Sequence, residues 1–269
     1  MYKRQALDFA ANIICSSDLT DIRYLYRFGE YITENEIGMA KFLNTLSEEE
    51  IQAMARTFTE GYRTGFVLTG KDITKKKTVN IRFQLGFERM VKAAIEQFKA
   101  MDLKPVIYRS AVHSVNKKQH HRIGYYGAIP NPQFEYDHKD DAALYLDHEF
   151  VHRKLRVLQV AYEQVKGLAA VHGGPACMET FGETPFAPEK RKEACTLTSH
   201  QQKLQVTYDN EAGQIVNRYI KGEERSFTII AYPVMEIGEQ FEEIFRETVK
   251  SIPWIISFTA EFSRISLTL

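Results

Sequence analysis

The stretch that decides the fold is KKTVNIRFQLGFERMVKAAIEQFKAMDLKPVIYR, residues 76–109. Its first part, TVNIRF (78–83), is rich in the β-branched and aromatic residues that strands prefer. Apolar residues then recur at steps of three and four from Phe87 to Met101, which predicts an amphipathic helix. PVIYR (105–109) predicts a second strand. A strand, a helix and a strand form a βαβ unit, so we expect two parallel strands joined by a right-handed crossover.

The segments that follow continue the alternation of strands and helices. A helix is predicted over 147–170, a strand over 176–182, a helix from near Ser199, a strand over 226–233 and a helix over 238–250. The first of these helices carries one apolar face, formed by Val151, Leu155, Leu158, Tyr162, Val165 and Leu168. This order predicts an α/β fold with a mostly parallel open sheet and helices on both faces.

The first quarter of the chain is predicted to be a helical segment, residues 1–70, that precedes an α/β domain of residues 71–250. Ser47 is followed three residues later by Glu50, which is the pattern of a capping box and marks a helix start. Apolar residues at helical spacing come next and predict one buried stripe. They are Ile51, Met54, Ala55, Phe58 and Tyr62.

The composition is that of an ordinary globular protein. Of its 269 residues 44% are hydrophobic, and 35 Lys+Arg balance 35 Asp+Glu. Zero net charge gives no general attraction to nucleic acid or to an anionic membrane, so we expect neither as a partner. No signal-peptide core is found, and the longest apolar run, 252–258, is too short to span a bilayer. Three widely spaced cysteines, Cys15, Cys177 and Cys195, favour a reducing cytoplasm.

His148-Glu149-Phe150-Val151-His152 is a literal HExxH motif. On a helix this spacing places two imidazoles on one face for zinc and supplies a glutamate as general base, as in a zincin-type protease. His148, Glu149 and His152 are therefore the residues of the one zinc site that the sequence offers.

The surroundings of this motif argue against zinc catalysis. Arg153 and Lys154 follow it directly, and His152 falls on the polar flank of the helix. A third ligand would have to come from elsewhere, with Glu179 or Glu183 as candidates. We expect a solvated first helical turn whose acidic residues suit the helix dipole, and we keep the zinc protease as the less favoured alternative.

Other motifs have weaker support. Gly65 to Lys71 matches the first seven places of a phosphate loop, but Asp72 stands where a Ser or Thr is needed, and the loop precedes a strand instead of leaving one. The ligand-rich stretch 135–141 is expected to be a solvated loop. The same holds for the basic run of Lys117, Lys118, His120, His121 and Arg122. The residues alone thus predict a scaffold without a reaction centre: no catalytic, cofactor-binding or metal-binding residue is assigned.

Six segments carry a resemblance to a known family. They are EGYRTGF (60–66), KKTVNIRFQLGFERMVKAAIEQF (76–98), KPVIYR (104–109), YDHKDDAALYLD (136–147), FGETPFAP (181–188) and RSFTIIAYP (225–233). In sequence and order they resemble the thermophilic-metalloprotease aminopeptidases, the group of aminopeptidase T, aminopeptidase S, PepS and leucyl aminopeptidase, in the long form found in clostridia.

The resemblance implies a two-domain cytoplasmic enzyme, usually a homodimer, that removes N-terminal residues from peptide substrates. It also implies two divalent metal ions, zinc or cobalt, held in a C-terminal domain by glutamates, histidines and an aspartate beside a catalytic tyrosine. Such a pair binds the attacking hydroxide and polarises the scissile carbonyl.

The resemblance covers only the part that precedes this metal domain, and no family ligand maps onto a residue of this chain. We therefore expect the non-catalytic N-terminal portion of a metallo-aminopeptidase, inactive alone, with the C-terminal catalytic domain as its missing partner and an apolar patch left exposed. Residues 251–269 have no family character and are expected to be read out of frame. The alternative of a different class is a stand-alone α/β binding module that uses the carboxyl ends of its parallel strands.

Overall fold

The computed structural model describes residues 2–110 and 123–252, and the predicted βαβ unit is confirmed in it. Strand β1 (Thr78–Gln84) leads into α4 (Glu88–Ala100) and returns as β2 (Lys104–Val106), which pairs with β1 in parallel. The second strand is shorter than the predicted 105–109. A strand that was not predicted, β3 (Tyr125–Tyr126), pairs instead with the end of β1. Two residues are too few to show a period of two in the sequence.

The sheet continues on the other side of β1 with β4 (His172–Phe181) and β5 (Thr228–Pro233). The strand order is β2-β1-β4-β5, with β3 beside β1, and every described pairing is parallel. The α/β class with a mostly parallel sheet is thus confirmed. β4 starts at His172, before the predicted residue 176. The prediction missed this start because Gly173 and Gly174 lack the side chains that mark a strand.

The N-terminal quarter is helical as predicted. It contains α1 (Tyr2–Ser16), η1 (Ile22–Phe28), α2 (Glu34–Leu43), α3 (Glu48–Leu68) and η2 (Ile73–Lys75). The capping box is confirmed: the Ser47 N–H donates to Glu50 Oε2 at 2.8 Å, and the Glu50 N–H donates to Ser47 Oγ at 3.2 Å. The predicted stripe of α3 is fully buried.

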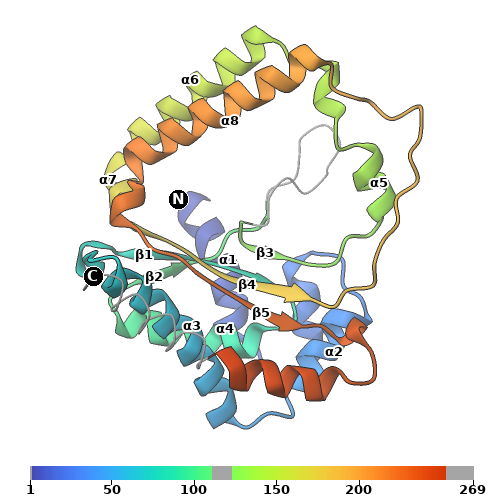
Figure 1. Ribbon diagram of the computed structural model, residues 1–269. Coiled ribbons are helices and arrows are strands. Elements are labelled where there is room, and N and C mark those ends of the chain that lie inside the picture. The colour runs from blue at the N-terminus through green and yellow to red at the C-terminus, as the bar shows by residue number, and fades with distance from the viewer. Residues whose placement is uncertain (1, 111–122, 253–269) are drawn as a thin grey trace, which may run out of the picture.

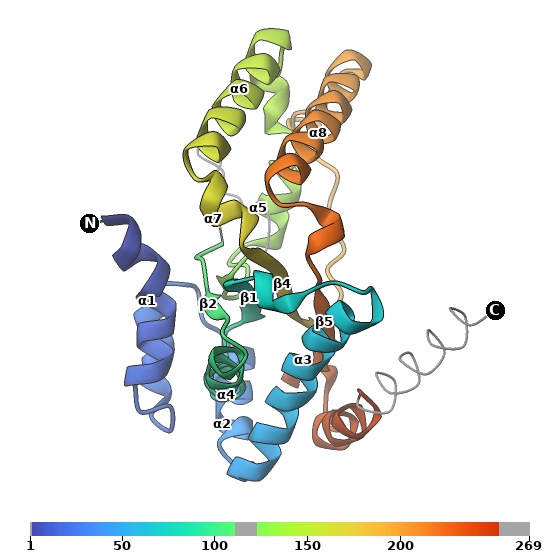
Figure 2. The same cartoon turned by 90° about the vertical axis from the view of Figure 1, so that its left-hand side faces the viewer.

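One face of the sheet is packed by α3 and α4, which lie side by side below it in Figures 1 and 2. Val79, Ile81 and Phe83 of β1 are 0% exposed and belong to this core. A helix over residues 241–252 begins three residues later than the predicted 238–250. It adds Phe245 to this core, and the ring of Phe245 stacks on that of Tyr232 with 5.4 Å between centroids. The same core includes buried residues of α1, α2 and α3.

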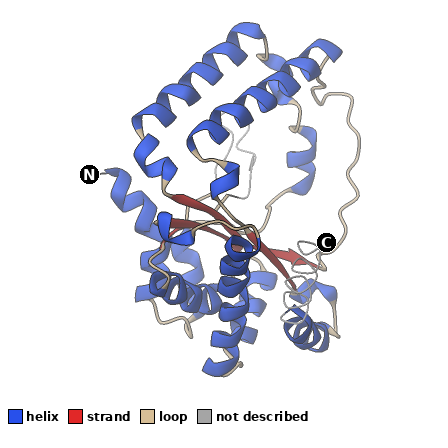
Figure 3. Cartoon of the chain, turned by 60° about the vertical axis from the view of Figure 1, so that its left-hand side comes forward, coloured by secondary structure: helices blue, strands red, loops and turns tan. Residues whose placement is uncertain are grey.

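Further helices lie on the opposite side of the sheet (Figure 3). They are α5 (Pro132–Asp137), η3 (Asp141–Leu144), α6 (His148–Gln164), α7 (Lys166–Ala170) and α8 (Ser199–Tyr219), and the short helices η4 (Gly222–Glu224) and η5 (Met235–Ile237) flank β5. No helix in the described ranges is long and apolar enough to cross a membrane.

Helices α6 and α8 run in the same direction and pack mainly on each other. Their first turns bring His148 and His200 within 5.5 Å between ring centroids, and at their ends Tyr219 donates to Glu163 at 2.9 Å. They enclose a small core of Leu146, Val151, Leu155, Leu204 and Ile215. The prediction of a single helix over 147–170 is wrong in one respect. The helix is interrupted at Val165, between α6 and α7, and Leu168 is 71% exposed.

Candidate functional site

The sheet has a polar face on the side opposite α3 and α4. Successive side chains of a strand point to opposite sides, so Asn80 and Arg82 of β1 lie on the face that Val79 and Ile81 do not occupy. Cys177 pairs in register with Arg82, and Glu179 follows on the same face of β4. We call the face formed by Asn80, Arg82, Cys177 and Glu179 the polar face.

Arg82 is anchored in the middle of this face. Its Nε donates to Asn80 Oδ1 at 2.9 Å, and Asn80 Nδ2 in turn donates to the carbonyl of Val106 at 3.1 Å. The side chain is half-buried. Within residues 2–110 and 123–252 no carboxylate forms an ion pair with it, so its two terminal nitrogens hold their hydrogen-bonding capacity for another group.

A second basic group lies close to the first. His172, at the start of β4, contacts Thr78 Oγ1 through Nδ1 at 3.0 Å. Burial, and then the charges of Arg225, Arg82 and Lys76, lower the pKa of His172 to about 4. This imidazole is therefore neutral at neutral pH, and the charged groups that act on it are all cations.

Two phenols and a thiol complete the surroundings of Arg82 and His172. Burial raises the pKa of Tyr108, against the opposing charge of Arg82, and burial followed by the proximity of Tyr108 raises the pKa of Tyr162 from α6. Burial also raises the pKa of Cys177, which is a free cysteine. A thiol held protonated in this way is a poor nucleophile, so the cluster lacks an activated attacking group.

This arrangement suits binding better than bond breaking. Guanidinium groups present several donors in a plane and bind carboxylates or phosphates with two parallel hydrogen bonds. This site was not predicted from the sequence, although β1 carries a signal for it. Strands of a parallel sheet that is packed on both faces are continuously apolar, whereas TVNIRFQ (78–84) alternates apolar with polar residues.

Among the described residues the HExxH side chains belong to no group of three that could hold a metal ion, although the ring of His200 lies 5.5 Å from that of His148. Asp147 caps α6 by accepting from the Phe150 N–H at 2.7 Å, and His148, Glu149 and His152 are exposed on the helix that follows.

The two glutamates named as further ligands lie elsewhere. Glu179 is on β4, and Glu183 accepts from Thr180 Oγ1 at 2.6 Å. No three His, Cys, Asp or Glu side chains of the described ranges form a group able to hold a metal ion. The family resemblance places its two divalent ions in a C-terminal domain, to which no described residue of this chain is assigned.

The loop resembling a phosphate site lies at the C-terminal end of α3, where carbonyl groups and not amides are free. Lys71 Nζ donates to the carbonyls of Gly222 and Arg225, and Asp72 caps η2 by accepting from the Thr74 N–H. These residues hold the fold together.

Of the two remaining charged stretches, one has local partners and the other lies outside the residues that the structure describes. In the stretch 135–141, His138 contacts Asp141 at 2.9 Å and Asp137 pairs with Arg191 at 3.5 Å. The basic run 117–122 lies outside the described residues.

The carboxyl end of β1 is filled by α2. Gly86 follows β1 with φ +107°, and a Cβ placed there would lie 2.9 Å from the carbonyl oxygen of Glu36 and from Met39 Cβ. Gln84 Nε2 donates to Glu36 Oε1 at 2.8 Å. Ligands of open α/β sheets usually bind at this edge, so α2 takes the place that the binding-module alternative assigns to a ligand. In comparisons with protein-family models, curated proteins and solved structures, nothing matches this chain.

Proposed function

We propose that this chain is the non-catalytic portion of a metal-dependent aminopeptidase and that it packs against a domain carrying the two metal ions. The family resemblance of the six quoted segments supports the activity. The observation that carries the packing role is uncovered apolar surface on the side of the polar face. Phe227, directly before the edge strand β5, is 64% exposed and Ile229 of β5 is 59% exposed. On α6, Val157 is 63% and Val160 51% exposed.

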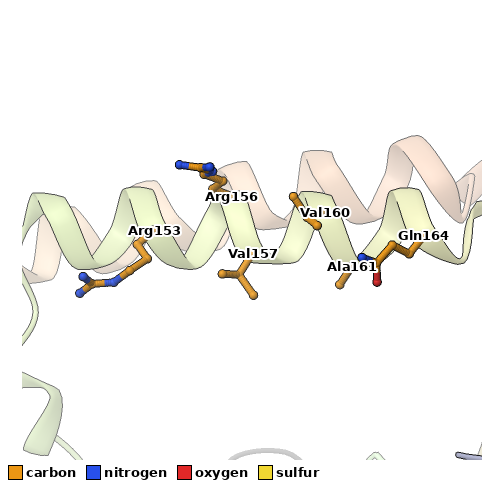
Figure 4. A pocket seen from close by; sticks show the side chains of 6 residues that line it. All are labelled: Arg153, Arg156, Val157, Val160, Ala161 and Gln164. Carbon is orange, nitrogen blue, oxygen red and sulfur yellow. The ribbon is translucent and has the colours of Figure 1, made fainter.

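Figure 4 shows Val157 and Ala161 on one side of α6 between Arg153 and Gln164. Burying each large apolar side chain of this kind contributes about 1.5–3 kcal/mol, so covering Phe227, Ile229 and Val157 together supplies a substantial share of a domain interface. A domain seated there would also limit access to its own active site and restrict the substrates to short peptides.

The proposal includes the compartment and the assembly state. Cys15, Cys177 and Cys195 are all free, which suits the reducing cytoplasm. The homodimer of the intact enzyme rests on the family resemblance.

The test is hydrolysis of leucyl p-nitroanilide with added cobalt or zinc. The 269-residue chain is expected to give no turnover above the metal blank. The same chain extended through a metal-carrying domain is expected to hydrolyse the anilide and to lose activity when the metal is chelated. Turnover by the 269-residue chain that a chelator abolishes would overturn the proposal, as would an inactive extended chain that is folded and loaded with metal.

A stand-alone binding module is the second candidate, and Arg82 favours it, because its guanidinium donates to Asn80 but forms no ion pair within the described ranges. On this alternative the ligand lies on the polar face, since α2 fills the carboxyl end of β1. Light scattering separates the two candidates: a binding module is a monodisperse monomer, whereas a portion that lacks its covering domain self-associates through exposed apolar surface.

A further inference from the structure

We propose that Arg82 and Arg225 bind the C-terminal carboxylate of a short peptide on the polar face of the sheet. The choice of a peptide rests on the proposed aminopeptidase function. The requirement for a carboxylate rests on the charges and contacts of this face alone.

Hydrogen bonds hold the side chain of Arg82 in place. The chain Arg82–Asn80–Val106 holds its Nε through two hydrogen bonds, of 2.9 and 3.1 Å, to a neighbouring strand. Less side-chain entropy is lost when a side chain that is already held binds a ligand. An arginine on a central strand, half-buried and without an ion pair in the described ranges, gains most from an anion that accepts two hydrogen bonds from its terminal nitrogens.

Arg225 supplies the second positive charge. Its Cβ lies 3.6 Å from the place where a Cβ on Gly174 would stand, so its side chain begins beside the first residues of β4. Its charge and that of Arg82 both reach His172. Lys76, the third cation near this histidine, forms an ion pair with Glu224 at 3.2 Å, a carboxylate that Lys221 also contacts at 3.1 Å. Among the described residues neither guanidinium group forms an ion pair, and the charges of both act on one imidazole.

The remaining groups of the face fit a carboxylate. Glu179 is the acidic residue of the polar face, and its charge acts on the neighbouring Cys177. It forms no ion pair with Arg82 in the part of the chain that the structure describes, and its single negative charge against the two arginines leaves an excess of one positive charge. Tyr108 and Tyr162 keep their protons and can donate hydrogen bonds. His172 stays uncharged and adds a neutral polar side chain to these surroundings.

The experiment is isothermal titration of the 269-residue chain at neutral pH with leucyl-glycine, with leucyl-glycinamide and with inorganic phosphate. We expect the free acid to bind and the amide to bind at least about tenfold more weakly, since a charge-assisted hydrogen bond is lost. Arg82→Gln and Arg225→Gln are each expected to weaken binding of the free acid by about 10- to 100-fold. The matched control is Arg56→Gln, which removes an exposed arginine from α3 on the other side of the sheet and should leave the affinity unchanged.

Circular dichroism and urea unfolding establish that each variant is folded, and the two arginine variants give independent readings if one is unstable. Equal affinity for the acid and the amide, or no binding of either by the folded chain, would overturn the proposal. Phosphate binding that Arg82→Gln abolishes, without binding of the dipeptide, would overturn the assignment of a carboxylate. An extended chain that fails to hydrolyse peptides while this site binds leucyl-glycine would refute the proposed function and leave the carboxylate site standing.

Discussion

Glu88 offers a direct test of the packing at the start of α4, where a carboxyl group is completely buried. Its side chain is 0% exposed, and Oε2 accepts from the Tyr24 hydroxyl at 2.6 Å and from the Gly86 N–H at 2.9 Å. Burial raises the pKa of Glu88 from 4.5 to about 7, and the two hydrogen bonds oppose that rise while the nearby Glu36 adds to it.

The raised pKa determines the sign of the pH dependence. The folded protein holds this proton more tightly than the unfolded chain, so the Glu88 contribution to stability is complete below pH 4.5 and decreases as the pH rises to about 7. Each pH unit in this interval corresponds to about 1.4 kcal/mol, so deprotonation of Glu88 lowers the free energy of unfolding by about 3 kcal/mol between the two limits.

Glu88→Gln removes the titration and keeps a similar shape. We expect the difference in unfolding free energy between variant and wild type to shift by about 3 kcal/mol in favour of the variant between about pH 4.5 and about pH 8. Urea unfolding followed by far-UV circular dichroism across this range measures it. Glu49→Gln, at an exposed position in the first turn of α3, should show no such shift. A difference that is independent of pH, or that favours the wild type at high pH, would refute the reasoning.

Three further predictions follow from the packing and the surface. Phe58→Ala should cost about 3–5 kcal/mol in urea unfolding, because Phe58 is 0% exposed and its ring meets Phe98 edge-on at 6.0 Å; a loss below about 1 kcal/mol would mean that the core is not packed as described. Ile229→Lys should reduce self-association in light scattering by placing a charge on the exposed edge strand, and a wild type that is already monodisperse contradicts this expectation. Zinc titration should give the same result for wild type and His148→Ala, while stoichiometric binding lost on substitution would restore the zinc-protease alternative.

Local signals in the sequence predicted most of the elements, and the tertiary partners of some of them were not predictable in this way. The period of α4 and the capping box at Ser47 are encoded in neighbouring residues, and both are confirmed. The apolar stripe of α6 equally well suits a helix that packs on a sheet and one that packs on another helix. Val151 and Leu155 in fact meet α8. Periodicity defines which face of a helix is buried but not what buries it.

The end of α6 shows a second limit of this kind. Val165 and Leu168 continue the apolar period, but the helix stops before them, and Gly167 in the same turn weakens helix propagation. The prediction of one helix extended the period across a residue that opposes it. The helix ends at Gln164, before the position that opposes it, and helical structure resumes in α7 (Lys166–Ala170), which contains Gly167.

Arg82 shows how a departure from the expected pattern identifies a site. A charged side chain on a central strand loses part of its hydration when the sheet forms, and an ion pair or hydrogen bonds compensate the part that is lost. One hydrogen bond, to Asn80, offsets a part of it, and no carboxylate among the described residues offsets the rest. A leucine at this position would fit the apolar character of a parallel sheet better. Because packing alone does not account for an arginine there, its role is sought in what binds to the polar face, and the carboxylate of a peptide is the ligand whose charge and geometry match it.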